Sequence, residues 1–412
     1  MNGVPLPEVN IGLVGHVDHG KTSLTQSLTG KWTDTHSEEI KRGISIRLGY
    51  ADATFYFCKK CNSYGSSKKC NRCFGDAEPS RSVSFVDAPG HETLMATMLS
   101  GAYLMDGAVL VIAADEKCPQ PQTSEHMKAL DVVGIKNIVI VQNKIDIVSE
   151  QQAVENFKQI KAFVKGTVAE NAPIIPTSAV HNTNIDILIE TIEKTIPTPV
   201  RKEGSPKFYI ARSFDINKPG TLIAELKGGV IGGSLTQGSI EVGDEIEIKP
   251  GVHQGEVWKP VKTKVTEIIQ SGEVLKKAEP GGLVALQTKL DPALSRSDSM
   301  AGSMAGKDLP ETSGIVKMNV EMFNYVIGTQ GKQQIQGLKV SDVLLLTVAI
   351  AKTIGVVTSV KKSKKGEKQA DANSFLIETK LKMPVIAEKG ERVAISKQVS
   401  GRWHLIGHGI VV

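Results

Sequence analysis

A glycine-rich loop near the start of the chain combines residue types that can bind phosphate. Gly15 to Thr22 reads Gly-His-Val-Asp-His-Gly-Lys-Thr and fits the pattern G-x-x-x-x-G-K-[ST]. The glycines let the backbone N–H groups point at phosphate oxygens, the Lys21 ammonium reaches the outer phosphates, and the Thr22 hydroxyl can ligate Mg²⁺. The loop therefore predicts nucleotide-binding residues at Asp18, His19, Gly20, Lys21, Thr22 and Ser23, although the His19 side chain is assigned no chemistry. A chance glycine loop before a helix is the alternative.

A second motif, Asp87-Ala-Pro-Gly90, fits the pattern D-x-x-G. The Asp87 carboxylate can hold Mg²⁺ through water, and the Gly90 N–H can bond to a γ-phosphate that only a triphosphate supplies. His91 follows directly and could orient the attacking water, which makes Asp87, Gly90 and His91 the predicted catalytic residues. A surface histidine beside a loop is the competing interpretation of His91.

A third motif, Asn143-Lys144-Ile-Asp146, predicts that the base is guanine. The Asp146 carboxylate can accept hydrogen bonds from N1–H and the 2-amino group, a donor pair that adenine lacks. A site built to pair with such donors rejects ligands without them by orders of magnitude. Ser178, Ala179 and Val180 follow the next predicted strand and can close the base pocket with a backbone N–H.

The segment between the first two motifs, Lys41 to Ile46, lies where a first switch loop is expected. Ser45 carries a hydroxyl that could ligate Mg²⁺ together with Thr22 when γ-phosphate is present. This assignment follows from the order of the motifs along the chain.

Four of the five cysteines form two close pairs, Cys58-x-x-Cys61 and Cys70-x-x-Cys73. Two thiol pairs on short turns suit tetrahedral Zn²⁺, and four thiolates leave no open position for catalysis, so the expected role is structural. The alternatives are cysteines that bind nothing and, less favoured, an iron–sulfur centre. We expect an insert at 56–76 that depends on the metal for its order.

The elements that must position these motifs follow from hydropathy. Short apolar runs, at 9–14, 83–86, 108–113, 138–141 and 173–176, alternate with helix-like segments up to residue 196. Such alternation predicts an α/β nucleotide-binding domain with a mostly parallel sheet and helices on both faces, whose ligands bind at the carboxyl ends of the strands. A Pro-rich linker and β-rich, turn-rich composition follow, so two β-barrel domains are expected. The predicted limits are 1–200, 206–320 and 321–412.

Composition narrows the classes of protein. Apolar residues make up 40% and charged residues 23%, as in ordinary globular proteins, and no apolar run is long enough to span a membrane. The first residues lack a signal-peptide pattern and the cysteines suit a reducing compartment, so a cytoplasmic location is expected. Residues 325–412 hold 14 Lys+Arg and 6 Asp+Glu, a net +8 within the total of +5. The positive charge of this segment is compatible with binding RNA, with binding an acidic protein, or with a surface that only contacts solvent.

The motifs together resemble the translational GTPases related to elongation factor Tu, and more specifically the gamma-subunit family of archaeal and eukaryotic translation initiation factor 2. The first resemblance lies in 14–22 and 87–91. The stretches that carry the second are 36–43, the four-cysteine insert, 94–101, 119–123, 212–220 and 401–407. The short segment before the first strand resembles archaeal members.

The resemblance implies a GTP-binding domain followed by two β-barrels, and a GTPase that is slow in isolation, with GTP or GDP, Mg²⁺ and Zn²⁺ bound. It implies that methionylated initiator tRNA is carried to the small ribosomal subunit, with alpha and beta subunits as partners, no membrane, and hydrolysis as the release switch. It also implies that Asp18 and Gly43 contact a second Mg²⁺ in some states. The family usually has Thr at the position of Ser45. Ser45 keeps the hydroxyl of threonine but lacks its methyl group. An elongation-type GTPase, such as the selenocysteine-specific factor, and a scaffold without meaningful turnover are the alternatives.

Overall fold

The computed structural model describes residues 4–32, 48–91, 94–255, 257–327, 334–335, 337–362, 374–399 and 401–412. The chain divides into two compact units, the first formed mainly by Met1–Pro199 and the second mainly by the remainder. Among the described residues, no helix is both long enough and apolar enough to cross a membrane.

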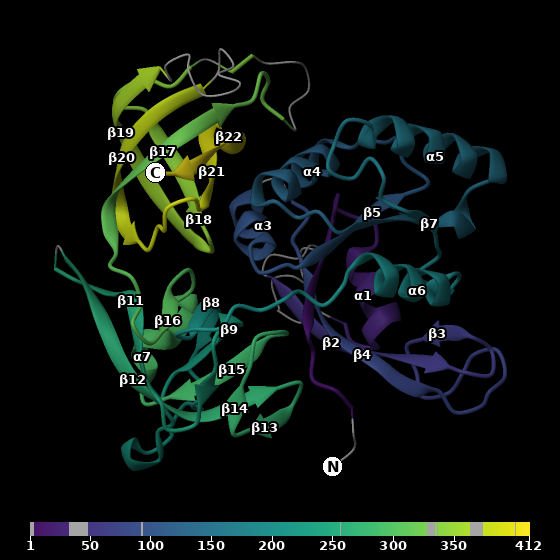
Figure 1. Cartoon of the computed structure of the whole chain (residues 1–412), viewed down its shortest axis with the longest axis horizontal. Helices are drawn as coiled ribbons and strands as arrows, with labels where there is room; N and C mark the ends of the chain where they lie inside the picture. Colours follow the sequence, from purple (N-terminus) through teal and green to yellow (C-terminus); the bar gives the residue numbers. More distant parts are fainter. Residues whose placement is uncertain are drawn as a thin grey trace. The chain divides into compact units, whose positions relative to one another are not determined.

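The first unit is a seven-stranded sheet in the order β3-β2-β4-β1-β5-β6-β7. Its strands are β1 (Val9–Gly15), β2 (Gly49–Cys58), β3 (Ser63–Gly65), β4 (Glu78–Asp87), β5 (Gly107–Ala113), β6 (Ile138–Asn143) and β7 (Ile174–Pro176). Its helices are α1 (Lys21–Thr29), α3 (Met95–Ala102), α4 (Pro121–Val133), α5 (Glu150–Val164) and α6 (Ile185–Thr195). Figure 1 shows α1 and α6 on one face of the sheet and α3, α4 and α5 on the other.

The expected α/β fold is confirmed, with one refinement. Strands β4, β1, β5, β6 and β7 run parallel, whereas β2 and β3 add an antiparallel edge that makes the sheet mixed. Strand β2 was not expected from the sequence, because its buried residues alternate with half-buried ones instead of forming a continuous apolar run. The core between the sheet and helices α1 and α6 consists of fully buried aliphatic side chains and Phe55 and Phe85.

The second unit contains two closed β-barrels of six strands each, as the composition predicts. The first closes as β11-β16-β8-β9-β15-β12, and β12 pairs back to β11. The second closes as β17-β20-β19-β18-β21-β22, and β17 pairs with β22. Closure removes exposed strand edges, which would otherwise pair with other chains. Each barrel encloses its own cluster of buried aliphatic side chains.

The barrel strands have the following bounds. The first barrel and its flanking pieces comprise β8 (Lys207–Phe214), β9 (Val230–Gln237), β10 (Ile240–Glu241), β11 (Glu245–Gln254), β12 (Val257–Gln270), β13 (Glu273–Leu275), β14 (Lys277–Ala278), β15 (Val284–Thr288), helix α7 (Pro292–Ser295) and β16 (Met304–Gly306). The second barrel comprises β17 (Ser313–Met322), β18 (Val343–Val348), β19 (Ala351–Lys362), β20 (Ser374–Val385), β21 (Arg392–Val399) and β22 (Arg402–Val411). Because β17 pairs only within the second barrel, that barrel begins near Ser313, and the boundary expected at 320/321 falls inside a strand.

Candidate functional site: a phosphate loop and a guanine-type pocket

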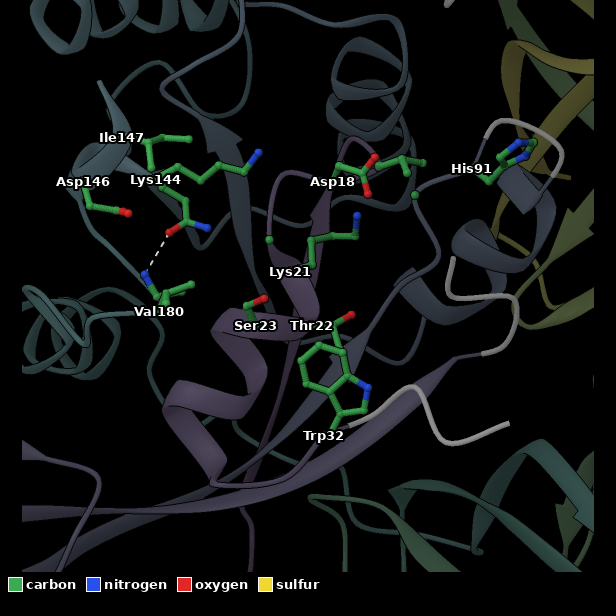
Figure 2. Close-up of a pocket in the computed structure, with 15 residues that line it drawn as sticks. Asp18, Lys21, Thr22, Ser23, Trp32, His91, Lys144, Asp146, Ile147 and Val180 are labelled. Atoms are coloured by element: carbon green, nitrogen blue, oxygen red, sulfur yellow. Dashed lines mark hydrogen bonds between the residues drawn. The ribbon is translucent and has the colours of Figure 1, made fainter. Parts of the chain in front are cut away.

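One pocket of about 380 Å³ in the first unit brings the three sequence motifs together. It lies at the carboxyl ends of β1, β4 and β6, where ligands bind in parallel α/β sheets. Figure 2 shows Lys21, Thr22 and Asp18 in its middle, Asp146 and Val180 at one edge and His91 at the other. The lining residues are Val17, Asp18, Gly20, Lys21, Thr22, Ser23, Trp32, Gly90, His91, Asn143, Lys144, Asp146, Ile147, Ala179 and Val180.

Backbone geometry explains the glycines of the phosphate loop. Gly20, at the start of α1, has φ 87°, and a Cβ there would lie 2.4 Å from the Asn143 amide nitrogen. Gly90 has no room for a Cβ either, because that atom would lie 2.6 Å from the Lys21 ammonium. Gly20 therefore lets the Asn143 side chain approach the phosphate loop, and Gly90 lets the D-x-x-G loop pack closely on it.

The phosphate end of the pocket contains the Lys21 ammonium group and two side-chain oxygens, from Thr22 and Asp87, that could ligate a metal ion. The buried Lys21 ammonium donates to the His16 carbonyl oxygen at 2.6 Å, which holds it within the loop. The Thr22 hydroxyl donates to Asp87 Oδ2 at 3.0 Å. A hydroxyl beside a carboxylate is a hard oxygen donor set that fits Mg²⁺. Asp87 is fully buried below the pocket and does not line it.

The base end of the pocket is braced by Asn143. Its amide donates to the His19 carbonyl oxygen at 3.0 Å and its carbonyl accepts from the Ala179 N–H at 3.1 Å. Because the side chain is buried and bonded to two loops, it connects the phosphate loop to the 178–180 loop.

The predicted base-reading carboxylate lies in the pocket and is ionised. A hydrogen bond from the Ser178 side chain holds the pKa of Asp146 below its usual range. His181 Nε2 lies 3.6 Å from Asp146 Oδ2. Ser178 itself is buried and does not line the pocket, so it supports Asp146 instead of facing a ligand.

Four predicted residues have side chains that face away from the pocket or lie outside the described part of the chain. The buried His19 ring faces away from the pocket, with Nδ1 3.1 Å from the Val111 carbonyl oxygen, so only its backbone can serve a nucleotide. His91 lines the pocket, but Figure 2 shows its ring pointing away from Lys21 and Thr22. Gly43 and Ser45 lie outside the described residues.

The structure also identifies residues that the motifs do not include. Trp32 and Ile147 line the pocket, and Trp32 is 49% exposed. His126 on α4 lies beneath the loop and accepts a hydrogen bond from the Gly15 N–H at Nδ1, at 2.9 Å. Complete burial lowers the pKa of His126 to about 3, so the ring is neutral at pH 7. No spacing rule connects positions 15 and 126, which are brought together by the packing of α4 on β1.

The four paired cysteines converge as expected. Their Sγ atoms all lie within 4.8 Å of one another, and Cys58 Sγ is 3.7 Å from Cys73 Sγ. A tetrahedron with metal–sulfur bonds of about 2.3 Å has sulfur atoms about 3.8 Å apart. Hydrogen bonds from the backbone amides of Cys73 and Arg72 lower the pKa of the Cys70 thiol to about 6. A hydrogen bond with the Cys73 side chain raises the pKa of the Cys61 thiol to about 12. The thiols therefore cannot all ionise at neutral pH without a cation among them.

Comparison with known proteins first defines the class. Residues 7–198 match the model of the elongation factor Tu GTP-binding domain, and residues 315–411 match that of the initiation factor eIF2 gamma C-terminal domain. Together with the pocket, these matches define a translational GTPase. Solved structures agree on the fold. A bacterial selenocysteine-specific elongation factor has a TM-score of 0.73 at 24% identity, over 98% of this chain and 58% of that one.

Sequence relatives define the family. Translation initiation factor 2 subunit gamma from Methanococcus vannielii is 56% identical over 98% of both chains. The same subunit from Archaeoglobus fulgidus is 55% identical over 100% of this chain and 96% of its own length. The chain therefore belongs to the gamma-subunit family of translation initiation factor 2, and it is a translation initiation GTPase. The resemblance seen in the motifs is confirmed.

Proposed function

We propose that this chain binds GTP and GDP in the pocket described above and uses the nucleotide as a switch for carrying methionylated initiator tRNA to the small ribosomal subunit. The observation that supports the proposal most directly is the meeting of the G-x-x-x-x-G-K-T, D-x-x-G and N-K-x-D motifs in one pocket. The gamma-subunit relatives support the initiation role.

In this proposal, Lys21 exchanges the His16 carbonyl oxygen for the outer phosphates, and Thr22 and Ser45 ligate Mg²⁺. Mg²⁺ held by these hydroxyl groups would neutralise part of the phosphate charge. The Gly90 N–H bonds to the γ-phosphate, and Asp146 reads the guanine base. Loss of the γ-phosphate removes the partner of Gly90, so the switch loops separate and tRNA is released.

Hydrolysis needs a rearrangement around His91, because its ring points away from the phosphate end (Figure 2). No arginine is among the residues that line the pocket in the described part of the chain. An arginine that stabilises the transition-state charge raises phosphoryl-transfer rates by about 10³–10⁵-fold. Slow turnover in isolation is therefore expected, and a partner on the ribosome would accelerate it.

The partners follow from the family. The relatives are named as subunits gamma, which supports alpha and beta subunits as partners here. Because its proposed site of action is the ribosome, the protein is expected in the cytoplasm. The four-cysteine cluster fits Zn²⁺ in donor type, number and spacing, and Cys58, Cys61, Cys70 and Cys73 would hold it as a structural ion.

The base assignment is tested with Asp146→Asn. The variant lacks the carboxylate that accepts hydrogen bonds from guanine N1–H and the 2-amino group. Each hydrogen bond to a charged group is worth about 1.5–3 kcal/mol, so GTP affinity is expected to fall about 10²–10⁴-fold. Xanthosine triphosphate, whose 2-oxo group accepts where guanine donates, gains affinity. Nucleotide titration of both proteins measures this. Unchanged selectivity for GTP would remove the base-pocket assignment.

The carrier role is tested by measuring binding of methionylated initiator tRNA and methionylated elongator tRNA, each with a non-hydrolysable GTP analogue and with GDP. The purified chain is assayed with its co-purified subunits. Preference for initiator tRNA in the GTP-analogue state is expected. Equal binding of the two tRNAs, or binding of selenocysteine tRNA instead, would overturn the initiator assignment and leave the GTPase class intact.

A further inference from the structure

An aromatic side chain on the four-cysteine insert has no structural reason to be there. Phe74 is 79% exposed, and its backbone is left-handed at φ 59°. Bulky residues adopt this conformation only at an energetic cost, and large exposed aromatics contribute nothing to a core. A strained, exposed residue of this kind is a reason to look for a function.

The turn itself explains the conformation but not the phenyl ring. The Phe74 N–H donates to the Cys70 carbonyl oxygen at 2.8 Å, and the Cys70 N–H donates to the Gly75 carbonyl oxygen at 2.9 Å. These bonds curl the chain around the sulfur atoms and require the left-handed conformation at position 74. Glycine would satisfy the same turn without strain, and the ring adds no packing.

The turns around the cysteines are strongly basic. Within the insert at 56–76 the chain has five cationic residues and one carboxylate, that of Asp76. All five are exposed, namely Lys59, Lys60, Lys68, Lys69 and Arg72. A zinc tetrathiolate would carry two negative charges and Asp76 carries one, so the five cations leave the insert at +2.

The ion pairs of this surface do not neutralise it. Lys59 pairs with Glu78, and Lys69 with Asp76, but the side chains are 65–84% exposed, and such pairs are weak and readily exchanged. Lys60 and Lys68 form no ion pair within the described part of the chain. Arg72 bonds to Asp186 at the start of α6, which fixes the insert to the body of the unit.

The cysteines hold the aromatic and basic groups next to each other. Lys59 and Lys60 lie between Cys58 and Cys61, and Phe74 follows Cys73. Because the four sulfur atoms lie within 4.8 Å of one another, the lysine turn and the phenylalanine turn are neighbours. None of these residues lines the nucleotide pocket, so the surface is separate from it.

We propose that this basic aromatic surface, made of Lys59, Lys60, Lys68, Lys69, Arg72 and Phe74, binds an unpaired segment of RNA. An unstacked base lies on the Phe74 ring and the cations contact the flanking phosphates, which is the combination used for single-stranded nucleic acid. The complementary charge favours RNA, and stacking accounts for the exposed ring at a strained position. The inference goes beyond the proposed initiator-tRNA role and does not depend on it.

The test compares the whole chain with Phe74→Gly, using a fluorescein-labelled ten-nucleotide oligouridylate. Glycine relieves the backbone strain, so thermal stability, zinc content and GDP affinity are expected to stay unchanged or, for stability, to rise. RNA affinity is expected to fall about 5- to 150-fold through loss of stacking. Phe74→Asn, which also tolerates the left-handed conformation, gives the same comparison if the glycine variant does not fold. Phe157→Ala, on exposed helix α5, is the matched aromatic control.

The cations are tested with the double variant Lys60→Glu and Lys68→Glu. Removing two phosphate contacts is expected to reduce the slope of log affinity against log salt by about 1.4, whereas Lys158→Glu on α5 leaves it unchanged. Wild-type RNA affinity in a folded, zinc-loaded Phe74→Gly protein would overturn the proposal. So would binding of polyglutamate that depends on Phe74 while RNA binding does not, since the surface would then serve an acidic protein.

Discussion

Replacing His126 tests whether the phosphate loop is held in shape from below. The Gly15 N–H can only donate, so His126 Nδ1 at 2.9 Å is the acceptor and the ring proton is on Nε2. His126 is 1% exposed and Gly15 is buried. The bond therefore satisfies a donor that water does not reach in the folded loop.

Two substitutions separate this bond from packing. His126→Asn places Oδ1 near the position of Nδ1 and keeps an acceptor, while it loses ring volume. His126→Leu keeps more volume and offers no acceptor. A buried N–H donor without an acceptor costs about 1–3 kcal/mol. The leucine variant is therefore expected to lose that much free energy, of folding or of nucleotide binding, relative to the asparagine variant. Expressed wholly in nucleotide binding, the loss is about 5- to 150-fold in Kd for GDP.

The assay measures GDP affinity by titration and stability by urea unfolding for both variants. If the loop relaxes when empty, it must resume its shape to bind phosphate, and the loss appears in affinity. If it does not relax, the loss appears in the free energy of unfolding. A leucine variant equal to the asparagine variant in both measurements would refute the reasoning.

Two further predictions concern acid and metal. The depressed pKa of His126, about 3 against 6.5 when unfolded, means that the unfolded chain alone binds this proton between those values. The stability that neutral His126 contributes is present above pH 6.5 and is lost as the pH falls toward 3. In His126→Asn, the free energy of unfolding measured in urea is therefore expected to fall less steeply with acid, by up to about 1.4 kcal/mol per pH unit. An unchanged dependence of this free energy on pH would contradict the prediction. Removal of metal with a strong chelator is expected to expose four thiols to a thiol reagent, to leave Cys118 protected by burial, and to leave GDP affinity unchanged, because the pocket contains no residue of the insert. Loss of GDP affinity in step with thiol exposure would show that the insert supports the pocket.

The sequence predicted the pocket well because each motif is local. A glycine loop, a D-x-x-G turn and an N-K-x-D turn each specify their own backbone, and each follows a strand in the parallel part of the same sheet. Strand alternation then puts all three at one edge. Strand β2 and the start of the second barrel near Ser313 were harder to locate, because half-buried antiparallel strands carry a weaker hydropathy pattern.

Residue types and their spacing thus determined the guanine-nucleotide chemistry, the four-thiol cluster and the α/β-then-β architecture. Only the tertiary structure showed that the His19 ring faces the interior, that Asn143 braces two loops, and that His126 supports Gly15. These roles depend on contacts between positions more than 30 residues apart or on the direction of one side chain. Motif spacing records neither of these, because folding brings such residues together through packing that no local pattern encodes.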